Sequence, residues 1–134
     1  MPAAIMFHAK DPKEKLLEEI GDISETEIFN NQVLCAVYQR PEKTRGGIIL
    51  PGSNLDEDKY QSKVGLIIKM GSSAFEEDGD WFKGVKFALH DWVVFRPSDG
   101  WSITLKAKNG SEVLCRIIDD VNVKGRVQQP DAVW

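Results

Sequence analysis

The chain has 134 residues, of which 42% are hydrophobic and 28% are charged, and its formal net charge is −4. This length fits one domain with a real core. The acidic balance and the lack of a dense Lys/Arg cluster argue against a nucleic-acid binder, because phosphate contacts dominate the affinity of that class. No apolar stretch approaches the roughly 20 residues of a membrane span. Residues 1–7 are too short for a signal peptide, so we expect a cytoplasmic protein.

Residues 1–31 form an N-terminal extension in which we expect one short helix. Asp11 can cap this helix, Pro12 suits its first position, and Glu14 completes a capping box. A narrow apolar stripe follows at Leu16, Leu17 and Ile20. Gly21 can end the helix. Because so short a helix is marginal alone, it needs a surface to pack against.

From residue 32 onward the pattern changes to short strands. The runs 33–38 and 64–69 are apolar on both faces, which is typical of strands buried on both sides. In the run 101–106, Trp101, Ile103 and Leu105 alternate with polar residues, which predicts one dry and one wet face. Further strands are expected at 92–95, 112–116 and 121–127. The pair Asn109-Gly110 predicts a type I′ turn. The short strands and the turn between them predict an all-β domain over 32–127, a small barrel or sandwich, with a tail at 128–134.

The two cysteines, Cys35 and Cys115, each lie in an apolar, strand-like run. A buried free thiol is the usual occupant of such a position. The rest of the chain lacks the features of a secreted protein, where disulfides persist. We therefore expect two structural thiols and no disulfide.

Residues 41–62 do not fit the strand pattern. The segment is rich in Gly, Pro, Asp, Glu and Ser, and structureless loops of that length are usually functional or disordered. Within it, a glycine pair and a proline flank an apolar triplet, in the order Gly46, Gly47, Ile48, Ile49, Leu50 and Pro51. Charged residues lie on both sides, which is typical of a partner-binding segment. The alternative is another buried strand between two turns.

The energies of this loop favour weak binding by a single copy. Burying the three apolar side chains would contribute roughly 1.5–3 kcal/mol each. Fixing the backbone costs roughly 1–2 kcal/mol per residue, and more for glycine. The two terms nearly cancel. Several loops on one ring would bind well, because the later contacts are intramolecular. The sequence therefore predicts an oligomer that presents many loops.

Residues 71–89 also interrupt the strands. An acidic turn lies between two arms that contain aromatic residues, and this turn consists of Glu76, Glu77, Asp78, Gly79 and Asp80. We expect a hairpin that protrudes from the domain.

The order of these parts resembles the GroES-type co-chaperonin family over roughly residues 29–127. The glycine pair with its apolar triplet is similar to the family's mobile loop, between a strand at 32–40 and a return strand at 63–70. Gly71 resembles the glycine that closes the return strand, and the hairpin at 71–89 resembles the family's roof hairpin. The match continues through the runs 91–95, 99–101, 112–114 and 119–127. Among these, Gly100-Trp101 resembles a Gly-Tyr pair.

The sequence departs from the family pattern at three places. His90 stands where the family commonly has glycine, and Trp101 replaces tyrosine. The N-terminal extension, residues 1–31, is additional. The general pattern is closer to phage-encoded co-chaperonins than to a bacterial housekeeping one.

The resemblance implies a small, irregular GroES-like β-barrel that assembles into a seven-membered ring. It implies that the triplet of the mobile loop docks between helices of the apical domain of a GroEL-type chaperonin, which closes a folding chamber. ATP belongs to that partner, so no cofactor is expected. The acidic residues 76–80 would line the roof opening. The closing strand at 121–127 would pair with the first strand of a neighbouring subunit, which also covers an exposed edge.

Catalytic and metal sites find little support. The histidines are His8 and His90, and His90-Asp91 are neighbours that a strand would point to opposite faces. No Cys-x-x-Cys or His-x-x-x-His spacing indicates a metal site. We therefore expect no enzyme. Two alternatives remain. A structural or assembly protein, for example phage-associated, would use the loop as a fixed interface. An oligonucleotide-binding barrel would bind in a steeply salt-dependent way.

Overall fold

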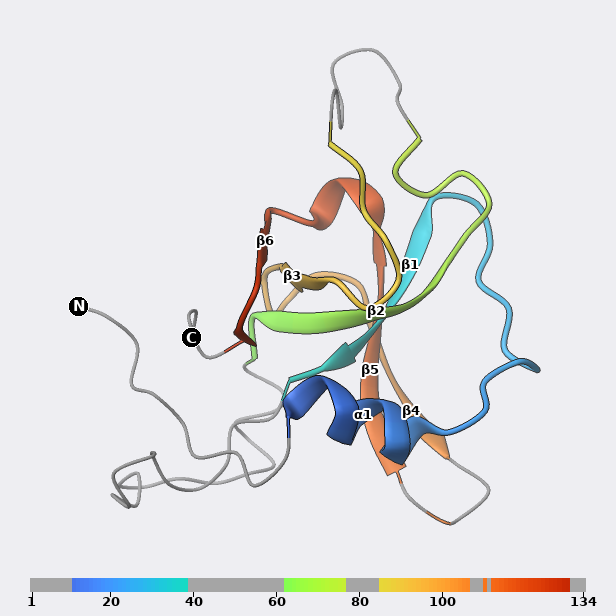
Figure 1. The fold of residues 1–134 in the computed structure, drawn as a ribbon. Helices are drawn as coiled ribbons and strands as arrows, with labels where there is room; N and C mark the ends of the chain where they lie inside the picture. Colours follow the sequence, from blue (N-terminus) through green and yellow to red (C-terminus); the bar gives the residue numbers. More distant parts are fainter. Residues whose placement is uncertain (1–10, 39–61, 77–84, 107–109, 111, 131–134) are drawn as a thin grey trace, which may run out of the picture.

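The computed structural model describes residues 11–38, 62–76, 85–106, 110 and 112–130. Six antiparallel strands form one strongly curled sheet in the order β4-β5-β1-β2-β3-β6 (Figure 1). The strands are β1 (Gln32–Val37), β2 (Val64–Met70), β3 (Trp92–Val94), β4 (Trp101–Lys106), β5 (Glu112–Asp119) and β6 (Gly125–Val127). One helix, α1 (Pro12–Ile20), and one 3₁₀ turn, η1 (Asp120–Asn122), complete the described elements. The predicted small all-β fold is confirmed.

The two central strands are buried on both faces, as their continuous apolar runs predict. Successive side chains of a strand point to opposite faces, so β1 divides its residues between two apolar clusters. Leu34 and Ala36 belong to the larger cluster, together with Leu66 of β2, whereas Val33 and Cys35 belong to the smaller one. This two-sided burial fixes the register, because a slip of one residue would exchange the two faces.

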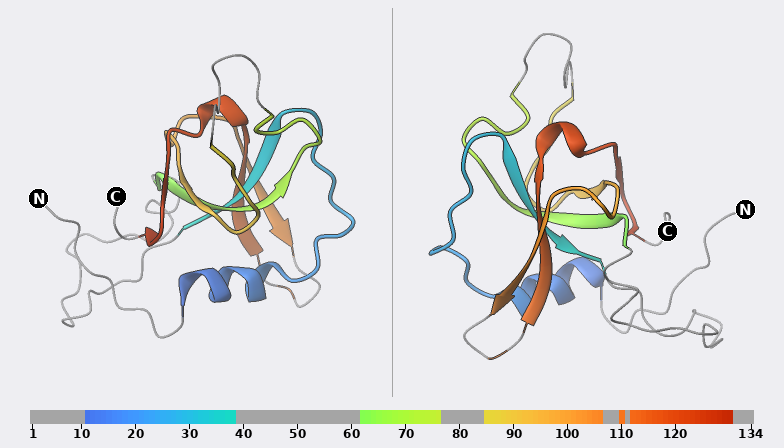
Figure 2. Two further views of the ribbon diagram at one scale, coloured as in Figure 1. Left: turned by 45° about the horizontal axis from the view of Figure 1, so that its top comes forward. Right: turned by 180° about the vertical axis from the view of Figure 1, so that it is seen from behind.

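The helix α1 begins at the predicted cap. The Glu14 amide donates to Asp11 Oδ2 over 3.4 Å, and Pro12 follows the cap directly. At the other end, the Gly21 amide donates to Leu17 O over 3.1 Å, and Gly21 has a φ of +66°. The apolar stripe faces the sheet, with Leu16 and Ile20 buried in the larger cluster. Figure 2 shows the helix lying across the end of the sheet formed by β4 and β5.

Two strand predictions are corrected by the structure. Residues 121–127 do not form one strand, because η1 occupies the first part and only Gly125–Val127 pairs, with β3. Trp101 is predicted on the dry face of β4, but 74% of it is exposed. It is the first residue of an edge strand, next to a glycine turn. Only the later residues, Ile103 and Leu105, reach the cluster under α1.

The first strand, β1, pairs with β5 on one side and with β2 on the other over residues 32–37. The pairing of the closing strand with the first strand of a neighbouring subunit, which the resemblance implies, stays a prediction. Within the described sheet, the strands with an unpaired side are β4 and β6. No helix among the described residues is long and apolar enough to cross a membrane.

Candidate functional site

The predicted partner-binding loop, Gly46 to Pro51, lies outside the described residues. What the structure shows is the base from which the segment 39–61 leaves the sheet and to which it returns. The base consists of the end of β1 and the start of β2, which are adjacent antiparallel strands with Val37 opposite Gly65. The two attachment points of the segment therefore lie side by side on the two central strands.

This base is tightly bonded. The Tyr38 amide donates to Val64 O over 3.0 Å, directly beyond the last paired residues of β1. The buried Ser62 hydroxyl donates to Val64 O over 3.2 Å and accepts from the Val64 amide over 3.4 Å. The Tyr38 ring is buried and meets the Trp92 ring edge-on, with centroids 5.8 Å apart. An edge-to-face aromatic pair adds to the stability from burial alone. The loop therefore starts from fixed positions on both sides.

The predicted acidic hairpin is described only at its base. Glu76 is exposed, whereas Glu77 to Asp80 lie outside the described residues. Phe75, at the end of the first arm, has a φ of +59°, and its amide donates to Asp120 Oδ2 over 3.0 Å. The other oxygen, Asp120 Oδ1, accepts from Asn31 Nδ2 over 3.1 Å. The buried carboxylate of Asp120, in η1, thus joins the first arm of the hairpin to the residue that precedes β1.

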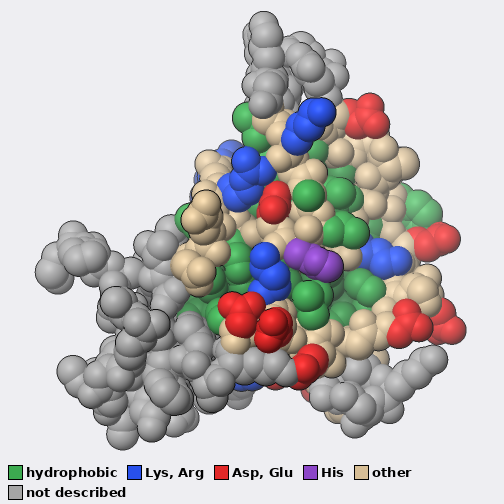
Figure 3. All heavy atoms as spheres, viewed as in Figure 1, with side chains coloured by type: hydrophobic (Ala, Val, Ile, Leu, Met, Phe, Trp, Pro, Cys, Tyr) green, Lys and Arg blue, Asp and Glu red, His purple; other side chains and the backbone are tan. Residues whose placement is uncertain are grey.

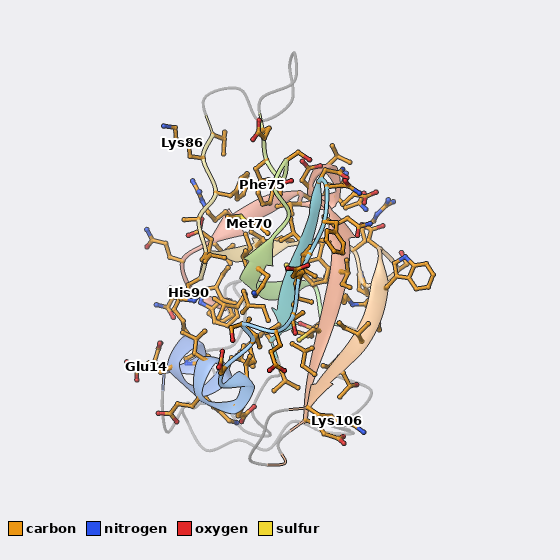
Figure 4. The ribbon with its side chains drawn as sticks, turned by 90° about the vertical axis from the view of Figure 1, so that its right-hand side faces the viewer. Glu14, Met70, Phe75, Lys86, His90 and Lys106 are labelled. Atoms are coloured by element: carbon orange, nitrogen blue, oxygen red, sulfur yellow. The ribbon has the colours of Figure 1, made fainter. Side chains whose placement is uncertain are left out.

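The second arm of the hairpin is held by Arg126 of β6. Its guanidinium donates to Lys86 O over 2.6 Å and lies 5.2 Å from the centroid of the Phe87 ring. The Phe87 ring stacks on Phe75, with centroids 4.2 Å apart. Figure 4 shows Phe75 and Lys86 at the same end of the sheet, opposite the end that carries Glu14 and Lys106. The segment 120–126 therefore bonds to both arms of the predicted hairpin.

Asp120 and Arg126 are not found by sequence reasoning. The hydrogen-bond partners of Asp120 lie 45 and 89 residues away along the chain, and Arg126 donates to a carbonyl 40 residues away. No local spacing carries such a signal. The apolar run around residues 121–127 instead predicts a regular strand there.

His90 and Asp91 lie directly before β3, and His90 has a φ of +74°. Asp91 Oδ2 accepts from the Ala88 amide over 3.0 Å and from Arg126 over 3.3 Å. His90 and Asp91, together with Lys13, line an open cleft of about 550 Å³. In the part of the chain that the structure describes, no three His, Cys, Asp or Glu side chains gather in a way that could hold a metal.

The cysteines are free and buried, as predicted. They lie on adjacent strands but on opposite faces, since Cys35 packs in the smaller cluster and Cys115 in the larger one. Burial raises the pKa of Cys115 to about 12 and raises that of Cys35 further, with a smaller contribution from the charge of Cys115. Both thiols are thus protonated and inert near neutral pH.

Comparison with known proteins gives two matches. The family model described as "Chaperonin 10 Kd subunit" (Cpn10) matches residues 25–121. The protein named "Co-chaperonin GroES" from Halothermothrix orenii (strain H 168) is 30% identical over 93 residues, covering 69% of this chain and 88% of the relative. The matched region begins shortly before β1 and runs into η1, so it contains five of the six strands and the base of the loop.

Proposed function

The chain belongs to the Cpn10 family of 10 kDa chaperonin subunits, and from this membership we propose how it acts as a co-chaperonin. It caps a GroEL-type chaperonin through the loop that contains Gly46 and Gly47, and this capping assists ATP-dependent folding of a client protein. ATP is bound by the partner. The proposal rests on the family match, which spans the loop and both strands of its base.

In this mechanism the apolar triplet Ile48, Ile49 and Leu50 enters an apolar groove of the partner. The glycine pair before it lets the backbone approach closely, and Pro51 limits the conformations of the chain after it. The bonded base at Tyr38 and Val64 supports this role, because ordering on binding is then confined to the loop itself. Less conformational entropy is lost when the attachment points are already fixed.

The same membership leads us to propose a homo-oligomeric ring of seven subunits. A ring brings several weak loops to one partner, which raises the total affinity without new contacts. Within it, the acidic turn from Glu76 to Asp80 would line the roof opening. The hydrogen bonds of Asp120 and Arg126 support a fixed position for this turn, since they join both arms of the predicted hairpin to the segment 120–126.

The substitution Ile49→Glu tests the loop mechanism. A charge in an apolar groove loses its hydration, so we expect the variant to lose chaperonin binding while its own ring persists. The matched control is Gln61→Glu, which adds the same charge to the same segment outside the triplet. Native mass spectrometry with a GroEL-type chaperonin and ATP would report subunit number and partner together.

The readout in solution is the ATP turnover of the chaperonin. We expect the original chain and Gln61→Glu to change this turnover equally, and Ile49→Glu to leave it at the rate of the chaperonin alone. If Ile49→Glu alters turnover as the original chain does, the triplet is not the contact and the mechanism is wrong.

A further inference from the structure

Three basic side chains from separate parts of the fold line the open cleft of about 550 Å³. Lys13 lies in the first turn of α1, His90 directly before β3, and Arg126 in β6. Figure 4 shows His90 and Glu14, the neighbour of Lys13, on the same side of the molecule. Figure 3 shows the described histidine with Lys or Arg side chains beside it. Basic side chains are thus concentrated at this cleft, although the formal net charge of the chain is −4.

The acidic side chain of the cleft already has partners. Of the described residues that line the cleft, Asp91 alone is acidic. Its Oδ2 accepts from the Ala88 amide over 3.0 Å and from Arg126 Nη1 over 3.3 Å. Among the ion pairs between described residues, none involves Lys13 or His90. Within this part of the chain, no carboxylate therefore offsets the attraction of these two side chains for an anion.

His90 is held in a strained conformation at this cleft. Its φ of +74° lies in the left-handed region, which glycine adopts freely and which a residue with a Cβ adopts at a cost. The His90 amide donates to Ile67 O over 2.7 Å, so the backbone is anchored to β2. The family that the chain resembles commonly has glycine here, and the fold alone requires no imidazole. Because strained residues gather at functional sites, the imidazole indicates a role in binding.

We propose that this cleft binds the phosphate group of a small molecule, with Lys13, His90 and Arg126 as its contacts. Arginine and lysine are common phosphate ligands, and a phosphate offers several acceptor oxygens to donors that approach from different elements. In the described part of the chain, both hydrogen bonds of Arg126 start from Nη1, so its other nitrogens are left as donors. The volume is typical of small-molecule sites, which favours a phosphorylated compound over free phosphate.

The N-terminal extension supplies one of the three contacts. Lys13 belongs to residues 1–31, which are additional to the family pattern. The first turn of α1 is fixed, because Pro12 is buried and the Glu14 amide donates to Asp11 Oδ2. Lys13 itself is half-buried. The site therefore goes beyond the proposed co-chaperonin function, and its test involves no chaperonin.

Isothermal titration calorimetry of the 134-residue chain measures this binding directly. The probes are inorganic phosphate and two phosphomonoesters, glycerol 3-phosphate and adenosine monophosphate, at an ionic strength kept constant with sodium chloride. Adenosine, which lacks the phosphate, is the control ligand. We expect saturable binding of both phosphomonoesters, weaker binding of inorganic phosphate, and no binding of adenosine.

Two substitutions remove contacts from the cleft. Lys13→Gln and His90→Gln should each lower the affinity for the phosphomonoesters by about tenfold or more, because each removes a hydrogen bond to a charged group. The matched control is Lys15→Gln, which removes the same charge from an exposed position of the same helix outside the cleft. Its affinity should change by less than about twofold, because an exposed charge outside the cleft is screened by salt. Arg126 is left unchanged, since it also bonds to Lys86 O.

The substitution His90→Gly separates binding from folding. Glycine relieves the positive φ, so this variant should be more stable in urea unfolding and should still lose affinity for the phosphomonoesters. A residue with only a structural role would not combine a gain in stability with a loss of affinity.

The outcomes decide the proposal. Saturable binding of the phosphomonoesters that is lost in Lys13→Gln and His90→Gly, and kept in Lys15→Gln, establishes the site. Equal losses in Lys13→Gln and Lys15→Gln would show a general attraction of the surface for anions and overturn it. The absence of saturable binding overturns it as well, and so does adenosine that binds like its monophosphate. Inorganic phosphate that binds as tightly as the esters would overturn the assignment to a phosphorylated small molecule.

Discussion

A position can require glycine because of its backbone conformation or because a side chain has no space there. Three glycines of this chain allow the two effects to be measured separately. Gly110 has a φ of +89°, and a Cβ built there meets nothing within 4 Å. At Gly71 a Cβ would overlap Asn30 O and lie 2.6 Å from Phe29 O, although φ is not positive. Gly100 combines both conditions, with a φ of +74° and a Cβ that would overlap Ile117 O. Substituting alanine at each measures the two effects separately.

The expected losses follow from these geometries. A positive φ costs a residue with a Cβ about 1–2 kcal/mol. A forced overlap with backbone costs typically about 1–3 kcal/mol, because the neighbouring strand must shift. Alanine returns about 0.4–1 kcal/mol by restricting the unfolded chain. We therefore expect Gly110→Ala to destabilise least, by at most about 1.6 kcal/mol, Gly71→Ala by up to about 2.6 kcal/mol, and Gly100→Ala most, by about 1–4.6 kcal/mol.

Urea unfolding followed by tryptophan fluorescence is the assay. The protomer concentration is kept fixed, because the proposed assembly would contribute to apparent stability. The slope of the free energy against urea should stay constant, so that differences in midpoint report stability. Equal losses in Gly100→Ala and Gly110→Ala would show that the approach of Gly100 to β5 is not as close as described. The magnitude argued from the overlap would then be refuted.

Three further predictions concern the turn before β3, the helix and the thiols. His90→Gly should stabilise the fold by about 0.5–1 kcal/mol in urea unfolding by relieving the positive φ, whereas His90→Ala should not. Leu16→Ala should destabilise by about 2–3 kcal/mol in the same assay because it opens a cavity between α1 and the sheet, and exposed Lys15→Ala should change stability by less than about 0.5 kcal/mol. Because burial raises the pKa of Cys35 and Cys115 above the ordinary value of 9.0, the unfolded thiols ionise first on alkalinisation. Their contribution to stability should therefore be complete below about pH 9 and fall above it, by up to about 1.4 kcal/mol per pH unit and thiol, which alkaline unfolding of Cys→Ala variants would measure.

The strands that could be predicted are those whose apolar pattern depends on burial alone. The runs around Leu34 and Leu66 are apolar on both faces, which is typical of strands covered on both sides. The helix was predictable because the residues that start it, Asp11, Pro12 and Glu14, are neighbours in the sequence. Periodicity and capping act over a few residues, so a single sequence reveals them.

Features that depend on contacts between distant segments could not be predicted. The run from residue 121 looks like a strand, but Asp120 is drawn into bonds with Asn31 and Phe75, which lie far away in the sequence, and η1 forms instead. Trp101 looks like a core residue by alternation, yet whether a face is covered depends on where α1 ends. The mobile-loop triplet Ile48, Ile49 and Leu50 stays a prediction from the sequence and the family.

The N-terminal extension and the sheet depend on each other. A helix as short as α1 is marginal in water, so its stability comes from packing Leu16 and Ile20 onto the larger cluster. The sheet depends on α1 in turn, because Ile103 and Leu105 of the edge strand β4 pack against the cluster that α1 covers. Without α1 these side chains would add an apolar surface beside an open strand edge, a combination that favours aggregation. The helix thus closes one face of the sheet, while the loop base at Tyr38 keeps its place in the same cluster. The part of the chain proposed to bind a chaperonin therefore starts from a core that the extension helps to build.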